Sequence, residues 1–131
     1  IDAAPSMIDK AKKLDSENQY HLVDIMQWTT EHSFDLIHSM ETMYYLEDPV
    51  KGIQRLSEWL KEDGVLVIGV DHYAENAQSL DWPEKVRTRM TTLSESEWID
   101  SFSTAGLSDV KSWRAAPKEG WPGTLVIAGR K

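Results

Sequence analysis

The stretch Val65–Val70, with the sequence VLVIGV, contains no polar side chain. A half-buried strand would alternate polar and apolar residues, so a continuous apolar run indicates a strand covered on both faces. Such strands lie at the centre of parallel sheets in α/β proteins. The run is far shorter than the roughly 20 apolar residues that a membrane-spanning helix needs. The sequence therefore predicts a chain organised around a central parallel strand.

Three helices are predicted around this strand, over residues 5–14, 49–61 and 94–105. Each shows apolar side chains three or four positions apart, which form one face of a helix. Pro5 and Pro49 suit the first helical position, where the missing N–H of proline costs nothing.

The expected helix ends carry further local signals. Asp48 and Ser94 are predicted N-caps, and Glu97 stands three residues after Ser94, as a capping box requires. Gly64 and Gly106 are predicted to stop the second and third helices.

Five strands are predicted, over residues 20–25, 34–39, 65–70, 108–115 and 124–129. The last two flank a loop rich in Pro and Gly and are expected to pair antiparallel. Alternation of helices and strands indicates an α/β sheet with helices on both faces. Residues 72–93 break this alternation and are expected to form an insertion on the substrate side.

Composition narrows the classes of protein. The chain has 131 residues and a mass of 15.0 kDa, which suits one domain. A net charge of -8 disfavours nucleic acids and anionic membrane surfaces as partners. The absence of Cys excludes disulfides and Cys-ligated zinc, and fits the cytoplasm. The sequence leaves open whether the chain forms a homo-oligomer. The first residue is Ile1 rather than Met, so we expect an incomplete gene product.

Several stretches, taken in their order along the chain, carry a family resemblance. They are Ile1–Ile8, Val23–Ile25, Phe34–Ser39, Leu60–Ile68 and Ala105–Leu107. Together they resemble the C-terminal portion of a class I S-adenosylmethionine-dependent methyltransferase. The resemblance implies a Rossmann-like sheet, mostly parallel with an antiparallel C-terminal hairpin, and S-adenosylmethionine as cofactor.

The resemblance also implies that part of the family's domain lies upstream of Ile1. The family's glycine-rich first-strand motif and most of its second strand have no counterpart in this sequence. Residues 1–131 are thus expected to form a single incomplete domain with a gap within its sheet. An upstream segment in the natural protein, a truncated product, and a partner chain that fills the gap are the three explanations. The first two are favoured.

The resemblance assigns cofactor contacts to the N-terminal third of the chain. Asp2 would accept hydrogen bonds from the ribose hydroxyls, or would merely favour a helix dipole. Asp24 would accept from the adenine amino group, or would be an ordinary turn residue, with the backbone of Ile25 and Met26 beside the ring. Met7 would pack near the adenine or in the core.

The carboxyl end of the fourth family strand is a second place for cofactor contacts. His38, Ser39 and Met40 lie there, and ligands of open α/β sheets sit outside such strand ends. Their backbone is expected to line the methionine moiety. A core histidine is the alternative for His38, and no metal site is predicted because no ligand spacing for one occurs.

Candidate catalytic residues follow the same strand ends. Glu41 and Tyr44 would orient the acceptor or take its proton, and His72 is the expected general base because histidine exchanges protons near neutral pH. A packing role for Tyr44 and a solvated loop position for His72 are the alternatives. The residues expected to contact the acceptor are Tyr45, Tyr73, Asn76, Trp82 and Arg87. For the last four, the alternative is a lid packed on the core with solvated arginines.

The expected function is methyl transfer from S-adenosylmethionine to a small-molecule acceptor. The cofactor's methyl group is already activated by a charged sulfur, so the protein chiefly positions the acceptor and excludes water. The acceptor atom, whether O, N, C or S, is left open. The alternative is a non-catalytic methyltransferase-like fragment that acts as a binding module.

Overall fold

The computed structural model describes all 131 residues, which form two compact units. Unit 1 comprises residues 1–31 and unit 2 comprises residues 32–131. None of the helices is both long enough and apolar enough to span a membrane.

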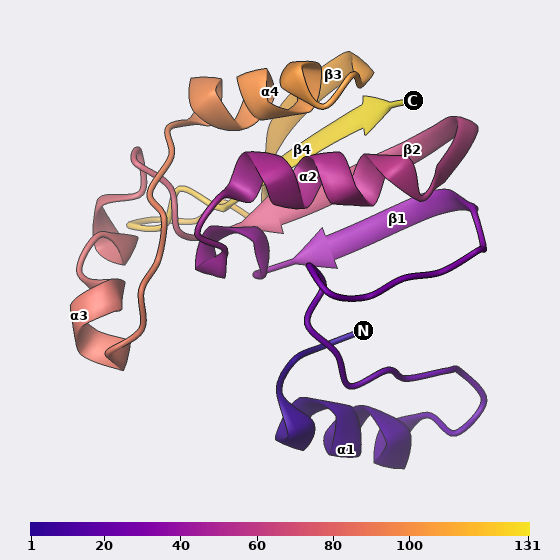
Figure 1. The fold of residues 1–131 in the computed structure, drawn as a ribbon. Coiled ribbons are helices and arrows are strands. Elements are labelled where there is room, and N and C mark those ends of the chain that lie inside the picture. The colour runs from indigo at the N-terminus through magenta and orange to yellow at the C-terminus, as the bar shows by residue number, and fades with distance from the viewer. The chain divides into compact units, whose positions relative to one another are not determined.

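Unit 2 is built on a four-stranded sheet in the order β1-β2-β4-β3. The strands are β1 (Phe34–Met40), β2 (Leu60–Val70), β3 (Ser108–Ala115) and β4 (Thr124–Arg130). β1 runs parallel to β2, and β4 pairs antiparallel with both β2 and β3. Figure 1 shows the C-terminal hairpin folding back so that its last strand lies next to β2. The Rossmann-like sheet with an antiparallel C-terminal hairpin is confirmed, but the sheet seen here is mixed rather than mostly parallel, because only the β1–β2 pair is parallel.

β2 is an inner strand, as its apolar sequence predicts, but its two faces differ. Leu66, Ile68 and Val70 have no exposed surface, whereas Val65 and Val67 on the opposite face are half-buried. The reason is that both long helices of unit 2 pack against each other over the same sheet face. The sequence predicted helices on both faces, but the remaining long helix belongs to unit 1.

Helices α2 (Pro49–Glu58) and α4 (Glu95–Thr104) begin as their sequence signals predict. The Asp48 carboxylate accepts a hydrogen bond from the Lys51 N–H at 3.1 Å. Ser94 and Glu97 form the expected capping box at the start of α4. Local capping chemistry therefore fixes where both helices start.

The predicted end of α2 is wrong. The helix stops at Glu58, and Gly64 lies inside β2 instead of after the helix. The Phe34 N–H donates to the Trp59 carbonyl at 2.8 Å, so pairing with β1 draws the chain into the sheet earlier. A Cβ on Gly64 would meet backbone oxygens of Lys61 and Phe34 at 2.8 and 3.0 Å, which explains the glycine.

Residues 72–93 contain a 3-10 turn, η2 (Ala77–Ser79), and the short helix α3 (Trp82–Val86). The first part of this segment is not an open loop, because His72, Tyr73 and Asn76 are completely buried. A second 3-10 turn, η1 (Met43–Tyr45), follows β1.

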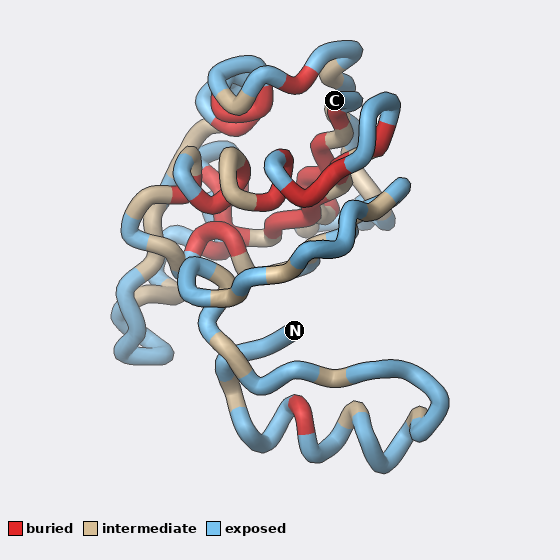
Figure 2. Tube along the Cα trace, turned by 45° about the vertical axis from the view of Figure 1, so that its right-hand side comes forward, coloured by how far each residue is buried: buried red, intermediate tan, exposed pale blue.

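Unit 1 contains helix α1 (Pro5–Leu14), as predicted. The strand predicted over residues 20–25 is wrong: Leu22 makes a single parallel bridge with Asp2, and a turn follows. A strand needs a neighbour along its whole length, and unit 1 offers only one paired residue. Ile8 is the one buried hydrophobic residue of this unit, whereas buried residues dominate the centre of unit 2 (Figure 2).

Candidate active site

The carboxyl ends of β1 and β2 lie side by side at one edge of the sheet in unit 2. Met40 pairs with Gly69, and the Glu41 N–H donates to the Gly69 carbonyl at 2.9 Å. Asp71 follows directly after β2. This edge is where ligands bind in open α/β sheets, so the residues just after both strands form the candidate site.

Glu41 is the most perturbed carboxyl group of this edge. Its backbone has a φ of 54°, in the left-handed region, and the Tyr44 hydroxyl donates to its Oε2 at 2.8 Å. Burial raises the pKa of Glu41 to about 7, the Tyr44 hydrogen bond opposes this, and the Asp71 charge adds to it. A carboxyl with a pKa near neutrality suits proton exchange at physiological pH.

Two carboxylate oxygens at this edge are buried without a hydrogen-bond partner, Glu41 Oε1 and Asp71 Oδ1. Asn76 holds the strand end in place, since its side-chain N–H donates to the Asp71 carbonyl at 2.7 Å. Buried acceptors without donors are costly, so a ligand that supplies an N–H or O–H group would be stabilised here.

His72 is fully buried, and both of its ring nitrogens are engaged. Nδ1 lies 2.9 Å from the Ser79 carbonyl oxygen and Nε2 lies 2.8 Å from the Thr92 hydroxyl. The carbonyl can only accept, so Nδ1 carries the proton and Nε2 accepts from Thr92. This geometry ties residues 72–93 to the strand end. It disfavours His72 as the general base and excludes the alternative of a solvated loop histidine.

Tyr44 links these groups. Its ring lies edge-on to the His72 ring, with centroids 5.6 Å apart, and only 3% of its surface is exposed. Burial and the hydrogen bond to Glu41 raise the pKa of the Tyr44 hydroxyl well above its ordinary value. Tyr44 therefore stays a neutral donor to Glu41.

The residues expected to contact the acceptor lie in different environments. Tyr73 and Asn76 are completely buried, and the Tyr73 hydroxyl donates to the Gly123 carbonyl at 2.9 Å, so both support the loops from within. Tyr45 is 46% exposed and Arg87 is exposed at the end of α3. Trp82 is half-buried and stacks on Trp121.

The last residues of β1 alternate in exposure. His38 and Met40 are exposed and Ser39 is half-buried. The alternative of a core histidine at position 38 is therefore wrong. The expected backbone contacts of these three residues with a cofactor stay a prediction.

In unit 1, Asp2 forms a bridge with Leu22, two residues before Asp24. Both carboxylates are exposed. Oδ1 of Asp2 accepts from the Ala4 N–H at 2.7 Å, and Oδ1 of Asp24 accepts from the Met26 N–H at 2.8 Å. Asp2 thus supports the turn before α1, and each carboxylate keeps a second oxygen on the surface.

The other predicted cofactor contacts of unit 1 differ in exposure. Ile25 is half-buried, whereas Met7 and Met26 are exposed. Core packing of Met7, the alternative to an adenine contact, is therefore not observed. No three His, Asp or Glu side chains converge as metal ligands would.

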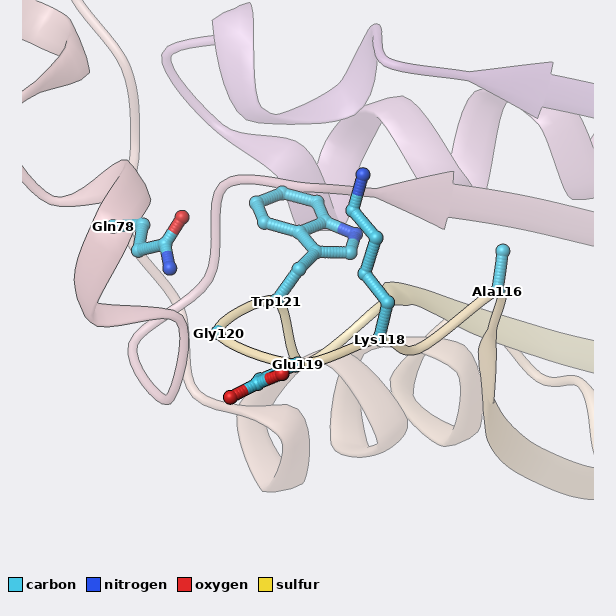
Figure 3. A pocket seen from close by; sticks show the side chains of 6 residues that line it. All are labelled: Gln78, Ala116, Lys118, Glu119, Gly120 and Trp121. Atoms are coloured by element: carbon cyan, nitrogen blue, oxygen red, sulfur yellow. The ribbon is translucent and has the colours of Figure 1, made fainter.

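A pocket that the sequence analysis missed lies between η2 and the loop joining β3 to β4. It has a volume of about 530 Å³ (Figure 3). Gln78 forms one wall, and the residues of the loop that line it are Ala116, Lys118, Glu119, Gly120 and Trp121. The only sequence signal for this pocket is a tryptophan between Gly120 and Pro122, a pattern that by itself predicts only a turn.

Comparison with known proteins defines the class to which this fold and these sites belong. The family model of the methyltransferase domain matches residues 1–112. The chain therefore belongs to the methyltransferase domain family, and S-adenosylmethionine is the cofactor of this class.

Particular relatives agree with this assignment. The chain is 27% identical, over 87% of its length, to a trans-aconitate 2-methyltransferase from Escherichia coli, and spans only 48% of that protein. It is 26% identical to a putative Haloferax volcanii methyltransferase solved in complex with the Trm112 methyltransferase activator, with a TM-score of 0.83 over 98% of this chain and 69% of that one.

A third similarity concerns the fold alone. N-methyltransferase NodS from Bradyrhizobium japonicum, solved in complex with S-adenosylhomocysteine, is 22% identical, with a TM-score of 0.74 over 99% of this chain and 64% of that one. The chain thus spans about half the length of the curated relatives it matches and about two thirds of these structures.

Proposed function

We propose that this chain supports methyl transfer from S-adenosylmethionine to a small-molecule acceptor. The observation that carries the proposal is Glu41, a half-buried carboxyl with a pKa raised to about 7, just after the carboxyl end of β1. When bound, S-adenosylmethionine supplies a methyl group on a positively charged sulfur. The protein therefore needs to bind, to orient and to remove one proton, rather than to activate the methyl group.

Asp2 and Asp24 suit the nucleoside part of the cofactor. Each carboxylate is fixed by a backbone N–H through one oxygen and presents the other to solvent. A carboxylate oxygen accepts from ribose hydroxyls and from an adenine amino group, which are both donors. In this proposal Asp2 binds the ribose and Asp24 binds the adenine, with the backbone of Ile25 and Met26 beside the ring.

Glu41 and Tyr44 act on the acceptor. Glu41 takes the proton that an N–H or O–H acceptor loses while the acceptor's new bond to the methyl carbon replaces the bond from that carbon to sulfur. Tyr44 donates to one carboxylate oxygen of Glu41, which leaves the buried Oε1 for the acceptor. Because both nitrogens of His72 are engaged, we assign His72 to positioning Tyr44 and the 72–93 segment.

The acceptor class and the partner are also proposals. The E. coli relatives are named for a small organic acid, which supports a small-molecule acceptor. The Haloferax neighbour is solved with an activator protein. Together with the chain's partial coverage of its relatives, this supports a second candidate, a non-catalytic methyltransferase-like module that binds a protein partner.

Calorimetric titration of S-adenosylhomocysteine into the chain separates the two candidates. The first predicts micromolar binding, and Asp2→Ala is expected to weaken it about tenfold, as the loss of a hydrogen bond to a charged group would. Asp9→Ala, an exposed acid on α1, is the matched control and is expected to bind like the wild type. No detectable binding by the wild-type chain would favour the module, and equal effects of both substitutions would refute the role of Asp2.

A further inference from the structure

The pocket between η2 and the β3–β4 loop lies at the reactive edge of the sheet. The loop joins Ala115 to Thr124, which pair with each other, and the next residue of β4, Leu125, pairs with Val70 at the carboxyl end of β2. The loop therefore emerges beside the strand end that leads into Asp71. A ligand in this pocket therefore lies at the same edge of the sheet as the candidate catalytic groups.

The walls of the pocket supply a flat apolar surface and several donors. Trp121 presents an indole ring, and its N–H can only donate. Lys118 is exposed and has no ion pair, so its ammonium is available to an anion. The side-chain nitrogen of Gln78 lies close to the loop, since a Cβ on Gly120 would meet it at 3.7 Å.

Glu119 also lines the pocket and is its one carboxylate. In Figure 3 the side chains of Lys118 and Trp121 rise from the same side of the loop, whereas Glu119 extends away from them. The groups that face a ligand beside the indole are thus a cation and donors. Such a set recognises a carboxylate attached to a planar group.

The pocket is also held in shape. Lys118 and Trp121 exchange two backbone hydrogen bonds of 3.0 and 2.8 Å, which close the turn between them. The Trp82 ring stacks on Trp121 with an interplanar angle of 14° and centroids 6.4 Å apart. On the other wall, Ser79 next to Gln78 is anchored by its bond to His72. A preformed pocket loses less entropy when it binds a ligand.

We infer that this pocket binds a planar, conjugated carboxylic acid, with the indole of Trp121 against the flat carbon frame and Lys118 on the carboxylate. The inference rests on the proposed function, because it identifies this acid as the class of methyl acceptor. It names Trp121, Lys118 and Gln78 as specificity residues.

Benzoate is a suitable probe, and benzamide is its neutral match. Chemical-shift titrations followed by NMR are expected to show tighter binding of benzoate. Lys118→Gln is expected to weaken benzoate binding by up to about fivefold, the loss of one exposed ion pair, and to leave benzamide binding unchanged. Trp121→Ala is expected to weaken both probes.

Two residues of β3 provide matched controls. Trp113 is 46% exposed and Lys111 is exposed, and neither lines the pocket. Trp113→Ala and Lys111→Gln are expected to bind both probes like the wild type. If Trp121→Ala does not fold, judged by its circular dichroism, Lys118→Gln carries the test because its side chain is exposed. Equal binding of both probes, or equal effects of Lys118→Gln and Lys111→Gln, would overturn the inference.

The titration with S-adenosylhomocysteine distinguishes this failure from failure of the proposed function. Lys118→Gln and Trp121→Ala are expected to keep wild-type affinity for S-adenosylhomocysteine. If S-adenosylhomocysteine binds normally and benzoate shows no preference, only the acceptor class is wrong. If benzoate binds as expected and S-adenosylhomocysteine does not bind at all, the ligand class of the pocket is supported and the proposed function is refuted.

Discussion

Glu41 ties the stability of the chain to pH. Burial raises its pKa from an ordinary 4.5 to about 7, so between these values the folded state holds a proton that the unfolded state releases. The contribution of Glu41 to the free energy of unfolding is therefore fully present below pH 4.5 and is lost as pH rises through about 7. Glu41→Gln removes the titration. We expect the free energy of unfolding of Glu41→Gln, relative to wild type, to rise by about 1–2 kcal/mol from about pH 5 to about pH 8, after allowance for solvent screening.

Urea denaturation at both pH values measures this difference. Glu62→Gln provides the control, because Glu62 is exposed. We expect its stability difference from wild type to be the same at both pH values. A parallel pH dependence in Glu41→Gln and wild type would contradict the assignment of a raised pKa to Glu41.

His72 is expected to act through stability. Replacing it with Ala removes two hydrogen bonds, leaves the Ser79 carbonyl without its donor and opens a cavity. We expect His72→Ala to lower the free energy of unfolding by about 2–4 kcal/mol. His38→Ala, at an exposed site, is expected to change it by less than about 0.5 kcal/mol. Thermal unfolding followed by circular dichroism compares the two, and similar stability of both variants would refute this role.

The difference between His72 and Glu41 shows what the sequence can predict about single residues. Both were recognised as candidates because they follow strand ends, which is a local signal. The partners of His72 stand 7 and 20 residues further along the chain, so its burial depends on how residues 72–93 fold back. Glu41 is perturbed largely by burial and by Tyr44 three residues away, a proximity that a turn after a strand produces directly.

At the scale of elements, the start of α4 makes the clearest prediction. The Ser94 side chain accepts from the Glu97 N–H, and the Glu97 carboxylate accepts from the Ser94 N–H at 2.7 Å. We expect Ser94→Ala to destabilise the chain by about 1 kcal/mol, because the first turn loses its cap. Ser103→Ala, near the exposed end of the same helix, is the control and is expected to be near neutral. Equal urea midpoints for the two variants would show that the cap does not contribute.

Elements with local start signals were predicted well, and elements that depend on neighbours were not. α1 and α4 follow from Pro5 and from the capping box, which lie within the helices' own first turns. Residues 20–25 have the composition of a strand, but a strand is stabilised by its partners, and here only Leu22 is paired. The early end of α2 has the same origin, since pairing with Phe34 draws residues 60–64 into β2.

For the whole molecule, the order of strands decides which loops share the candidate site. The antiparallel hairpin predicted at residues 108–129 is present, and the observed order places its last strand, β4, between β2 and β3. That order carries the loop with Lys118 and Trp121 to the edge that holds Asp71. Trp82 was predicted as an acceptor contact, whereas its stacking partner Trp121 was missed. The two residues are far apart in the sequence, and only the folding of the sheet brings their rings together.

The distribution of buried side chains predicts that unit 2 folds independently. Apart from Ile8, every buried hydrophobic residue lies in residues 32–131. Unit 1 has one helix of 10 residues, shorter than the roughly 12–15 at which isolated helices become stable in water. We therefore expect residues 32–131 alone to unfold cooperatively, with a Tm within about 5 °C of the 131-residue chain. Residues 1–31 alone are expected to give the circular dichroism of an unstructured peptide. A non-cooperative transition in residues 32–131 would show instead that unit 1 supplies stabilising contacts.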